Sequence, residues 1–322
     1  MSIVFVGTPD FAVPSLRQLV SDGFHVSAVV TQPDRPAGRG RKERPSPVSL
    51  AASELGLNVL KPEGLRSPAA IADIASLEPE AIVAVAYGQI LRQEVLDIPP
   101  RGVVNVHPSL LPRWRGPSPI PAAILAGDSE TGVTIMLMDA GMDTGPVLSQ
   151  TSEPIADTDT AGSLLDRLSR SGATLLSDTL RRWLAGQIEP RPQNGFRATT
   201  CSLLRKQDGE IDWSLPAIDI WRRVRAYNPW PGAFTSLNGE QLHIWQAWPI
   251  GAEPGQDPGT VVQINSSLSD ALPDHASGAS FAVRTGDGLL AIVEAQRAGR
   301  RSLPSAELLR GRPDLIGSRL GG

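Results

Sequence analysis

Short apolar segments alternate with helix-like segments over residues 1–188, and this alternation strongly restricts the fold. Residues 3–6, 26–31 and 81–86 are rich in β-branched side chains, which favour strands. Their continuous apolar character is typical of parallel strands that are buried on both faces. Residues 159–184 carry leucines at helical spacing and predict one long amphipathic helix. We therefore predict an α/β domain with a doubly wound parallel sheet over residues 1–188.

The remainder of the chain has a different pattern. Residues 189–206 are rich in Pro, Arg, Asn and Thr without periodicity, which is typical of a linker. Over residues 207–322 we predict a small all-β barrel or sandwich, because short β-like runs alternate there with Gly, Pro, Asn and Asp. These runs cover residues 232–237, 241–248, 259–264, 280–285 and 289–294. We also expect residues 266–280 to form a flexible loop.

Charge and cysteine content exclude several classes of protein. The formal net charge is −4, so any surface that binds nucleic acid must be local. Cys201 is the only cysteine, which excludes an intrachain disulfide and a metal site built from cysteines. The chain starts without a basic segment or cleavage site, and the apolar run 81–91 is too short to span a bilayer. We expect a cytoplasmic protein with no membrane contact.

Polar side chains interrupt one predicted strand at its carboxyl end. The strand over residues 103–107 carries Asn105 and His107, and a proline then prevents a regular continuation. Because Asn105 and His107 are two residues apart, their side chains share one face of the strand. Ligands bind at the carboxyl ends of strands in open parallel sheets. Tyr87 and Gly88 follow the neighbouring apolar strand, and we expect them to line the same crevice.

A carboxylate, Asp143, lies further along the chain in a loop that contains glycines. An amide, an imidazole and a carboxylate suffice for acyl transfer to an amine. Asn105 can stabilise the oxyanion of such a reaction, and His107 can donate or accept a proton at neutral pH. Asp143 can orient His107 or take the proton of the amine. The pattern leaves open which of His107 and Asp143 carries that proton.

Each of these residues also has a purely structural interpretation. Asn105 can satisfy backbone groups at a strand end, His107 can be a structural donor, and Asp143 can be a turn residue. Their occurrence together beside residues 109–112 favours the catalytic interpretation. We predict no metal site, because His107 is the only one of the four histidines that lies in a motif. Ser109 is not predicted to be a nucleophile, because no nucleophile elbow surrounds it.

A basic insertion covers residues 34–45, between a predicted strand and a predicted helix. Loops in α/β units usually have about 2–6 residues, and longer ones are often functional or disordered. Five basic residues against two acidic ones give the insertion a local charge of +3, and the basic residues are Arg35, Arg39, Arg41, Lys42 and Arg44. We interpret it either as a solvated surface loop or as a mobile, unpaired arm that orders on a polyanion.

The motif around the interrupted strand resembles that of a known family. Asn105-Val106-His107-Pro108-Ser109-Leu110-Leu111-Pro112, together with Asp143-Thr144-Gly145, is similar to the core of the formyltransferases that use 10-formyltetrahydrofolate. The resemblance implies that Asn105, His107 and Asp143 are catalytic and that no metal is needed. It also implies a folate site, whose expected contacts are Ser109, Leu110, Leu111, Pro112, Tyr87 and Gly88.

Other segments are similar to the branch of this family that formylates methionyl initiator tRNA, namely residues 7–12, 32–47, 113–116, 211–213 and 228–232. This resemblance covers nearly the whole chain. It implies a Rossmann-like catalytic domain, a C-terminal OB-like β-barrel that contacts tRNA, and formyl transfer to the α-amino group of methionyl initiator tRNA for translation initiation. The basic insertion would contact the tRNA, with Arg39 in the place of a critical arginine. We expect a monomer.

Two other functions remain open. A formyltransferase that acts on an amino-sugar nucleotide would share Asn105, His107 and Asp143, although so small an acceptor needs no cationic arm. A catalytically inactive tRNA-binding module would not need this set of three side chains. In the C-terminal domain, two groups of arginines are candidate tRNA contacts or merely solvated surfaces: residues 222, 223 and 225, and residues 297, 300 and 301.

Overall fold

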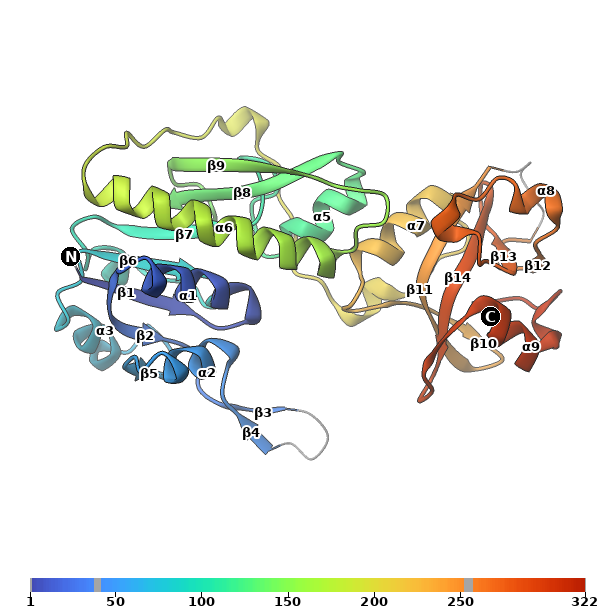
Figure 1. The fold of residues 1–322 in the computed structure, drawn as a ribbon, viewed down its shortest axis with the longest axis horizontal. Helices are drawn as coiled ribbons and strands as arrows, with labels where there is room; N and C mark the ends of the chain where they lie inside the picture. The colour runs from blue at the N-terminus through green and yellow to red at the C-terminus, as the bar shows by residue number, and fades with distance from the viewer. Residues whose placement is uncertain (1, 38–41, 252–256, 322) are drawn as a thin grey trace. The chain divides into compact units, whose positions relative to one another are not determined.

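The computed structural model describes residues 2–37, 42–251 and 257–321 (Figure 1). By their contacts, the residues group into two compact units. The first unit comprises residues 1–119, 130–154 and 164–202, and the second comprises residues 120–129, 155–163 and 203–322. Two stretches from within residues 1–188 thus belong to the second unit. The domain boundary at residue 188 and the linker over residues 189–206 stay predictions.

The first unit is built on a seven-stranded sheet with the strand order β5-β2-β1-β6-β7-β8-β9. Its strands are β1 (Ser2–Gly7), β2 (His25–Val30), β5 (Val59–Leu60), β6 (Ala81–Val85), β7 (Val103–His107), β8 (Glu130–Leu137) and β9 (Val147–Pro154). Neighbours from β5 to β7 pair in parallel, which confirms the doubly wound α/β prediction. β8 pairs antiparallel with both β7 and β9, so the sheet is mixed at this edge. The short connection between β8 and β9 permits only an antiparallel pair.

Helices pack against this sheet and fix the strand that carries the polar residues. They are α1 (Val13–Ser21), α2 (Pro47–Glu54), α3 (Pro68–Ala75), α4 (Gln93–Leu96) and α6 (Ala161–Leu184), with short 3-10 turns η1 (Asp10–Ala12) and η2 (Gly195–Arg197). Figure 1 shows α6 running along β7 and β8. The helix α6 approaches these strands closely at Gly172, where a Cβ atom would lie 3.3 Å from Val106 of β7 and from Val133 of β8. This close packing holds β7 in place.

The basic insertion forms a small hairpin rather than an unpaired arm. β3 (Arg35–Ala37) pairs antiparallel with β4 (Lys42–Arg44), and Arg35 lies opposite Arg44. Figure 1 shows the hairpin projecting away from the sheet of its unit. The prediction of an unpaired loop is therefore wrong for these six positions, because short backbone pairing needs no apolar periodicity. Arg39 and Arg41 lie outside the described residues.

The second unit contains an antiparallel, curled six-stranded sheet in the order β10-β11-β14-β13-β12, with β15 paired to β14. Its strands are β10 (Ala233–Leu237), β11 (Glu240–Ile250), β12 (Val261–Gln263), β13 (Phe281–Arg284), β14 (Leu289–Arg297) and β15 (Ser302–Pro304). The helical elements are α5 (Pro119–Ala126), η3 (Lys206–Gly209), α7 (Ala217–Ala226), α8 (Ser266–Ser269), η4 (Asp274–Ala276), α9 (Ser305–Gly311) and η5 (Pro313–Leu315). The predicted small β domain is confirmed as a half-barrel. The predicted flexible loop over residues 266–280 is wrong, since α8 and η4 lie there.

The core of the second unit is aromatic and aliphatic. Trp213, Trp221 and Phe281 are buried in one cluster with the leucines and isoleucines of the curled sheet. This cluster explains why several of the tryptophans lie in this part of the sequence. Among the helices formed by the described residues, none combines the length and apolar character needed to cross a membrane.

Candidate active site

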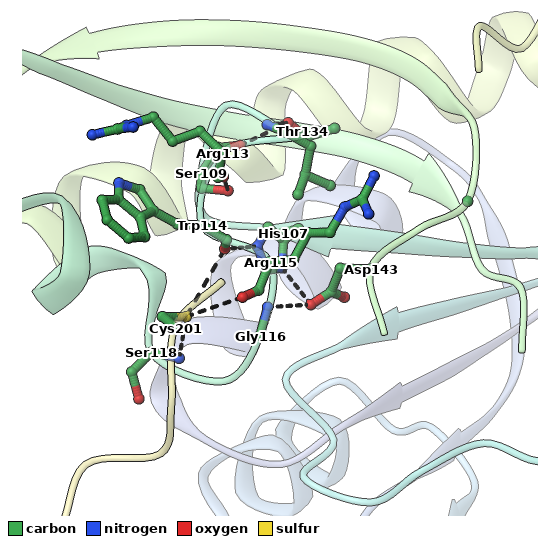
Figure 2. Close-up of polar contacts among 12 residues, drawn as sticks. His107, Ser109, Arg113, Trp114, Arg115, Gly116, Ser118, Thr134, Asp143 and Cys201 are labelled. Carbon is green, nitrogen blue, oxygen red and sulfur yellow. Dashed lines mark hydrogen bonds and ion pairs between the residues drawn. The ribbon is translucent and has the colours of Figure 1, made fainter. Parts of the chain in front are cut away.

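His107 occupies the end of β7 and is held by a backbone carbonyl. Its side chain is only 6% exposed, and Nε2 lies 3.0 Å from the carbonyl oxygen of Trp114. Because a carbonyl can only accept, Nε2 carries the hydrogen of this bond. The second ring nitrogen, Nδ1, lies 3.7 Å from Oδ2 of Asp143 (Figure 2). The structure therefore brings together the imidazole and the carboxylate that the sequence predicted to act jointly.

Asp143 is oriented by the loop that follows β7. Its Oδ2 accepts a hydrogen bond of 2.8 Å from the amide of Gly116. Asp143 has a backbone φ of 53°, in the left-handed region that few residues other than glycine adopt. Gly116 has a φ of 115°, and a Cβ atom there would lie 2.4 Å from the carbonyl oxygen of Cys201. Only glycine lets the chain pass so closely at this point.

Asn105 lies on the same strand, two residues before His107. It is partly exposed and is flanked by Ala84 of β6 and Met136 of β8. In the described parts of the chain, no group forms a hydrogen bond with the side-chain amide of Asn105. The amide is therefore available to a ligand in the structure, as an oxyanion donor would need to be.

The predicted folate segment, residues 109–112, is held by hydrogen bonds with β8. The Thr134 hydroxyl donates to the carbonyl of Ser109 at 2.6 Å and accepts from the amide of Leu111 at 3.1 Å. The hydroxyl of Ser109 is fully buried and donates to the carbonyl of Arg113 at 2.7 Å. Leu111 is buried as well, whereas Leu110 and Pro112 remain partly exposed. Only part of this segment thus offers a surface to a ligand.

Tyr87 and Gly88 contribute backbone rather than a side chain to this region. Tyr87 is 4% exposed as a residue and packs in the apolar core of the first unit. Its carbonyl oxygen accepts hydrogen bonds from Thr8 Oγ1 at 3.0 Å and from Gln32 Nε2 at 2.8 Å. Gly88 is exposed and has a φ of 81°. Any contact that these two residues make with a ligand would therefore run through Gly88 and the adjoining backbone.

Within the segment of residues 189–202, Thr199 and Cys201 contribute to the site, which the sequence did not predict. The hydroxyl of Thr199 accepts from the amide of Trp114 at 2.9 Å, and the carbonyl of Thr199 accepts from the amide of Arg115 at 2.9 Å. The Cys201 amide donates to the Arg115 carbonyl at 2.8 Å, and Cys201 Sγ accepts from the amide of Ser118 at 3.3 Å. Figure 2 shows Cys201 beside Trp114 and Gly116. Only isolated polar residues in an aperiodic segment signalled this role.

The position of Cys201 affects its acidity. Burial raises the pKa of the Cys201 thiol above its ordinary value, and the nearby Asp143 carboxylate raises it further. A thiol with a raised pKa is a poor nucleophile at neutral pH. We therefore assign Cys201 a structural role beside the site.

The basic hairpin presents exposed charge. Arg35 and Arg44 are exposed, and neither pairs with an acidic side chain among the described residues. Asp34 is one of the two acidic residues of the insertion, and it pairs with Lys61, outside the insertion, at 2.7 Å. The backbone of Lys42 belongs to β4. Like charges directly opposite one another on paired strands are unfavourable, so Arg35 and Arg44 destabilise this pairing.

One C-terminal arginine has a structural role that excludes it as an RNA contact. Arg225 is 8% exposed and donates to the carbonyls of Asp159 at 2.8 Å and Ala156 at 2.6 Å. Its guanidinium also lies over the ring of Trp221, 4.3 Å from the centroid. Burial lowers the pKa of Arg225 from its ordinary value. Arg297 pairs with Glu240 at 2.7 Å and remains partly exposed.

The described residues form no cluster that could hold a metal ion. Within residues 2–37, 42–251 and 257–321, no three His, Cys, Asp or Glu side chains gather as a metal site requires.

Comparison with known proteins identifies the family. A model described as Formyl transferase matches residues 1–180, and a model described as Formyl transferase, C-terminal domain, matches residues 203–313. A methionyl-tRNA formyltransferase of Roseiflexus castenholzii is 50% identical over 323 residues, which cover 100% of this chain and 99% of that protein. One from Chloroflexus aurantiacus is 49% identical over 311 residues, 97% of either chain. The chain belongs to the methionyl-tRNA formyltransferase family. It is a formyl-transferring enzyme.

Solved structures agree with this fold. An N-formyltransferase from Helicobacter canadensis, in complex with folinic acid and dTDP-3-aminofucose, is 20% identical with a TM-score of 0.64, over 92% of this chain and 98% of that one. A methionyl-tRNA formyltransferase from Clostridium thermocellum is 16% identical with a TM-score of 0.53, over 77% and 93%. At such identities they support the fold alone. The far higher identity to methionyl-tRNA formyltransferases favours that family over the sugar enzymes.

Proposed function

We propose that this enzyme transfers a formyl group from 10-formyltetrahydrofolate to the α-amino group of methionyl initiator tRNA, which prepares that tRNA to start translation. The observation that carries the proposal is the grouping of a free amide, Asn105, with the His107–Asp143 pair at one strand end. Relatives that are about half identical over the full chain are named methionyl-tRNA formyltransferases.

The three side chains match the needs of this reaction. The amine attacks the formyl carbon, the carbonyl oxygen becomes an oxyanion, and the leaving nitrogen gains a proton. Asn105 would donate to the oxyanion, and loss of such a donor costs on the order of 10²–10³ in rate. His107 and Asp143 would take the amine proton and deliver one to the leaving nitrogen. A free α-amino group has a pKa of roughly 7.7–8.0 and esterification should lower it, so a neutral amine is available without a strong base.

Folate recognition would use the loops around this pair. Leu110 and Pro112 are the partly exposed members of the 109–112 segment, while Ser109 and Leu111 would support them from within. Gly88 lies where a ligand can approach the backbone closely, since it is exposed and carries no side chain. The folinic acid in the similar Helicobacter canadensis structure agrees with a reduced folate as the formyl donor.

The basic hairpin would contact the tRNA backbone. Arg35 and Arg44 supply exposed positive charge, and phosphates would relieve the repulsion between them. Arg39, Arg41 and Lys42 are proposed contacts from the sequence. Division into a catalytic domain (1–188), a linker (189–206) and a tRNA-contacting domain (207–322) remains part of the proposal, as do the monomeric state and the cytoplasmic location.

A parallel assay with three acceptors tests this proposal. The enzyme is given 10-formyltetrahydrofolate with methionyl initiator tRNA, uncharged tRNA or an amino-sugar nucleotide. We expect formylated product with the charged tRNA alone. Product with the sugar alone would contradict the proposal and reassign the acceptor. Tight tRNA binding without product would instead support a tRNA-binding module that does not catalyse the reaction.

A further inference from the structure

Gln193 lies in the 189–202 segment, and its side-chain amide makes four hydrogen bonds. Oε1 accepts from the guanidinium of Arg115, at 3.1 Å from Nε and at 2.8 Å from the terminal nitrogen. Nε2 donates to the carbonyls of Asp143 and Gly145, both at 2.8 Å. A primary amide has two hydrogens to donate and one oxygen with two lone pairs. The side chain therefore uses its full capacity, which fixes its orientation.

These bonds connect the loop that carries Asp143 with the loop that follows His107. Asp143 and Gly145 lie in the loop between β8 and β9, and Arg115 lies in the loop after β7. Arg115 stands between two residues with direct roles: the Trp114 carbonyl accepts from His107, and the Gly116 amide donates to Asp143. Gln193 thus holds the loop of Asp143 against Arg115, whose two neighbours in the chain orient His107 and Asp143.

The backbone of these loops needs such support. Asp143 has a φ of 53° and Trp114 has a φ of 61°, both in the left-handed region. Residues other than glycine pay a conformational cost there, and such conformations persist only when surrounding interactions fix them. Gln193 binds the carbonyl of Asp143 itself, and Thr199 in the same segment binds the amide of Trp114.

We propose that Gln193 is a positioning residue that sets the distance and angle between His107 and Asp143. This proposal rests on the function proposed above. Gln193 acts through the backbone of Asp143 and through Arg115. Because a misplacement of about 1 Å can lower a rate by about 10²-fold, the role should affect the chemical step. Substrate affinity should change little.

Gln193→Glu tests the role with little change of shape. The carboxylate keeps the pairing with Arg115 but places an oxygen, instead of an N–H donor, against the carbonyls of Asp143 and Gly145. The matched control is Asn194→Asp, the same amide-to-carboxylate change one residue further along. Among the described residues, the Asn194 side chain takes part in one local hydrogen bond, which Oδ1 accepts from the amide of Phe196 at 3.1 Å.

We expect Gln193→Glu to lower kcat by about 10–10²-fold, with KM for the folate donor and for methionyl-tRNA changed by less than about threefold. Asn194→Asp should retain wild-type kcat. Wild-type kcat in Gln193→Glu, a loss confined to KM, or an equal loss in Asn194→Asp would each overturn the proposal. If Gln193→Glu does not unfold cooperatively on heating, Gln193→Met is measured instead, because it removes all four bonds without burying a charge.

A second readout does not depend on turnover. The ring nitrogens of His107 are followed by NMR on protein labelled with ¹⁵N-histidine, and the His107 signals are assigned by their loss in His107→Gln. Gln193→Glu should shift these signals and Asn194→Asp should leave them in place. Unshifted signals would overturn the positioning role. If wild-type enzyme formylated no acceptor, the proposed function would fail, while this measurement would still decide whether Gln193 sets the geometry of the pair.

Discussion

Two arginine-containing loops of the first unit contrast in how they are held. The loop after β7, residues 108–116, is bonded to β8, to the loop of Asp143 and to the 189–202 segment. The basic hairpin pairs its two strands with each other and places Arg35 opposite Arg44. Groups that react must be fixed within fractions of an ångström, whereas charges that attract phosphates act over several ångströms. The density of hydrogen bonds thus separates the proposed catalytic loop from the proposed binding arm.

The largest effect should follow from removing the charge in the fixed loop. Asp143→Asn keeps an oxygen that can accept from Gly116 but no longer stabilises a charged His107. We expect single-turnover formyl transfer to slow by about 10³-fold or more. Binding of methionyl-tRNA, measured by filter retention, should remain close to that of the wild type. A variant with more than a tenth of the wild-type rate would contradict the assigned chemistry.

The buried hydroxyl of Thr134 on β8 should stabilise the loop after β7. Thr134→Val removes the donor to the Ser109 carbonyl and the acceptor for the Leu111 amide. An unsatisfied buried polar group costs about 1–3 kcal/mol, so we expect the free energy of unfolding to fall by roughly 2–4 kcal/mol. Urea titration measures this change.

Thr131, on the same strand, provides the matched control for Thr134. It is 3% exposed, and its hydroxyl has no partner among the described residues. Thr131→Val should therefore change the free energy of unfolding by less than about 1 kcal/mol. Equal losses in the two variants would show that the hydrogen bonds of Thr134 do not hold the loop.

A smaller effect is expected from the hairpin. Replacing Arg35 and Arg44 together by Ala should weaken tRNA binding and reduce the slope of log K against log salt by about 1 for each phosphate that the hairpin no longer neutralises. The value of kcat at saturating tRNA should not change. Arg17→Ala is the control, because Arg17 is an exposed arginine that pairs with Glu54 on a neighbouring helix. An unchanged salt slope in the double variant would argue against phosphate binding by the hairpin.

The smallest effect concerns the thiol beside the site. Because the pKa of Cys201 is raised, the folded protein holds less thiolate than free cysteine at any given pH, and alkylation by iodoacetamide near pH 8 should be slow. The rate should increase only at higher pH. Asp143→Asn removes one cause of the raised pKa, so the thiol should react slightly faster in that variant. Alkylation of the wild type as fast as free cysteine would show that Cys201 is not shielded.

The same contrast explains what the sequence could predict. The sequence predicts that Asn105 and His107 share one face, because a strand places residues two apart on the same side. The bond from His107 to the Trp114 carbonyl was not, since backbone acceptors leave no side-chain pattern. Gln193 and Thr199 lie in an aperiodic segment, and their partners are distant in sequence. The hairpin was missed for a related reason, because its pairing depends on backbone bonds and not on apolar alternation.

The bond between Gln193 and Asp143 also has a consequence for the timing of biosynthesis. The two residues are 50 positions apart in the chain. At about 5–20 residues per second, a ribosome needs roughly 3–10 s to make that stretch. A nascent chain can therefore pair β7 with β8, and bring His107 near Asp143, before the glutamine that holds the two loops together has been made. The proposed positioning bonds of Gln193 can thus form only after the two loops that they join have been made.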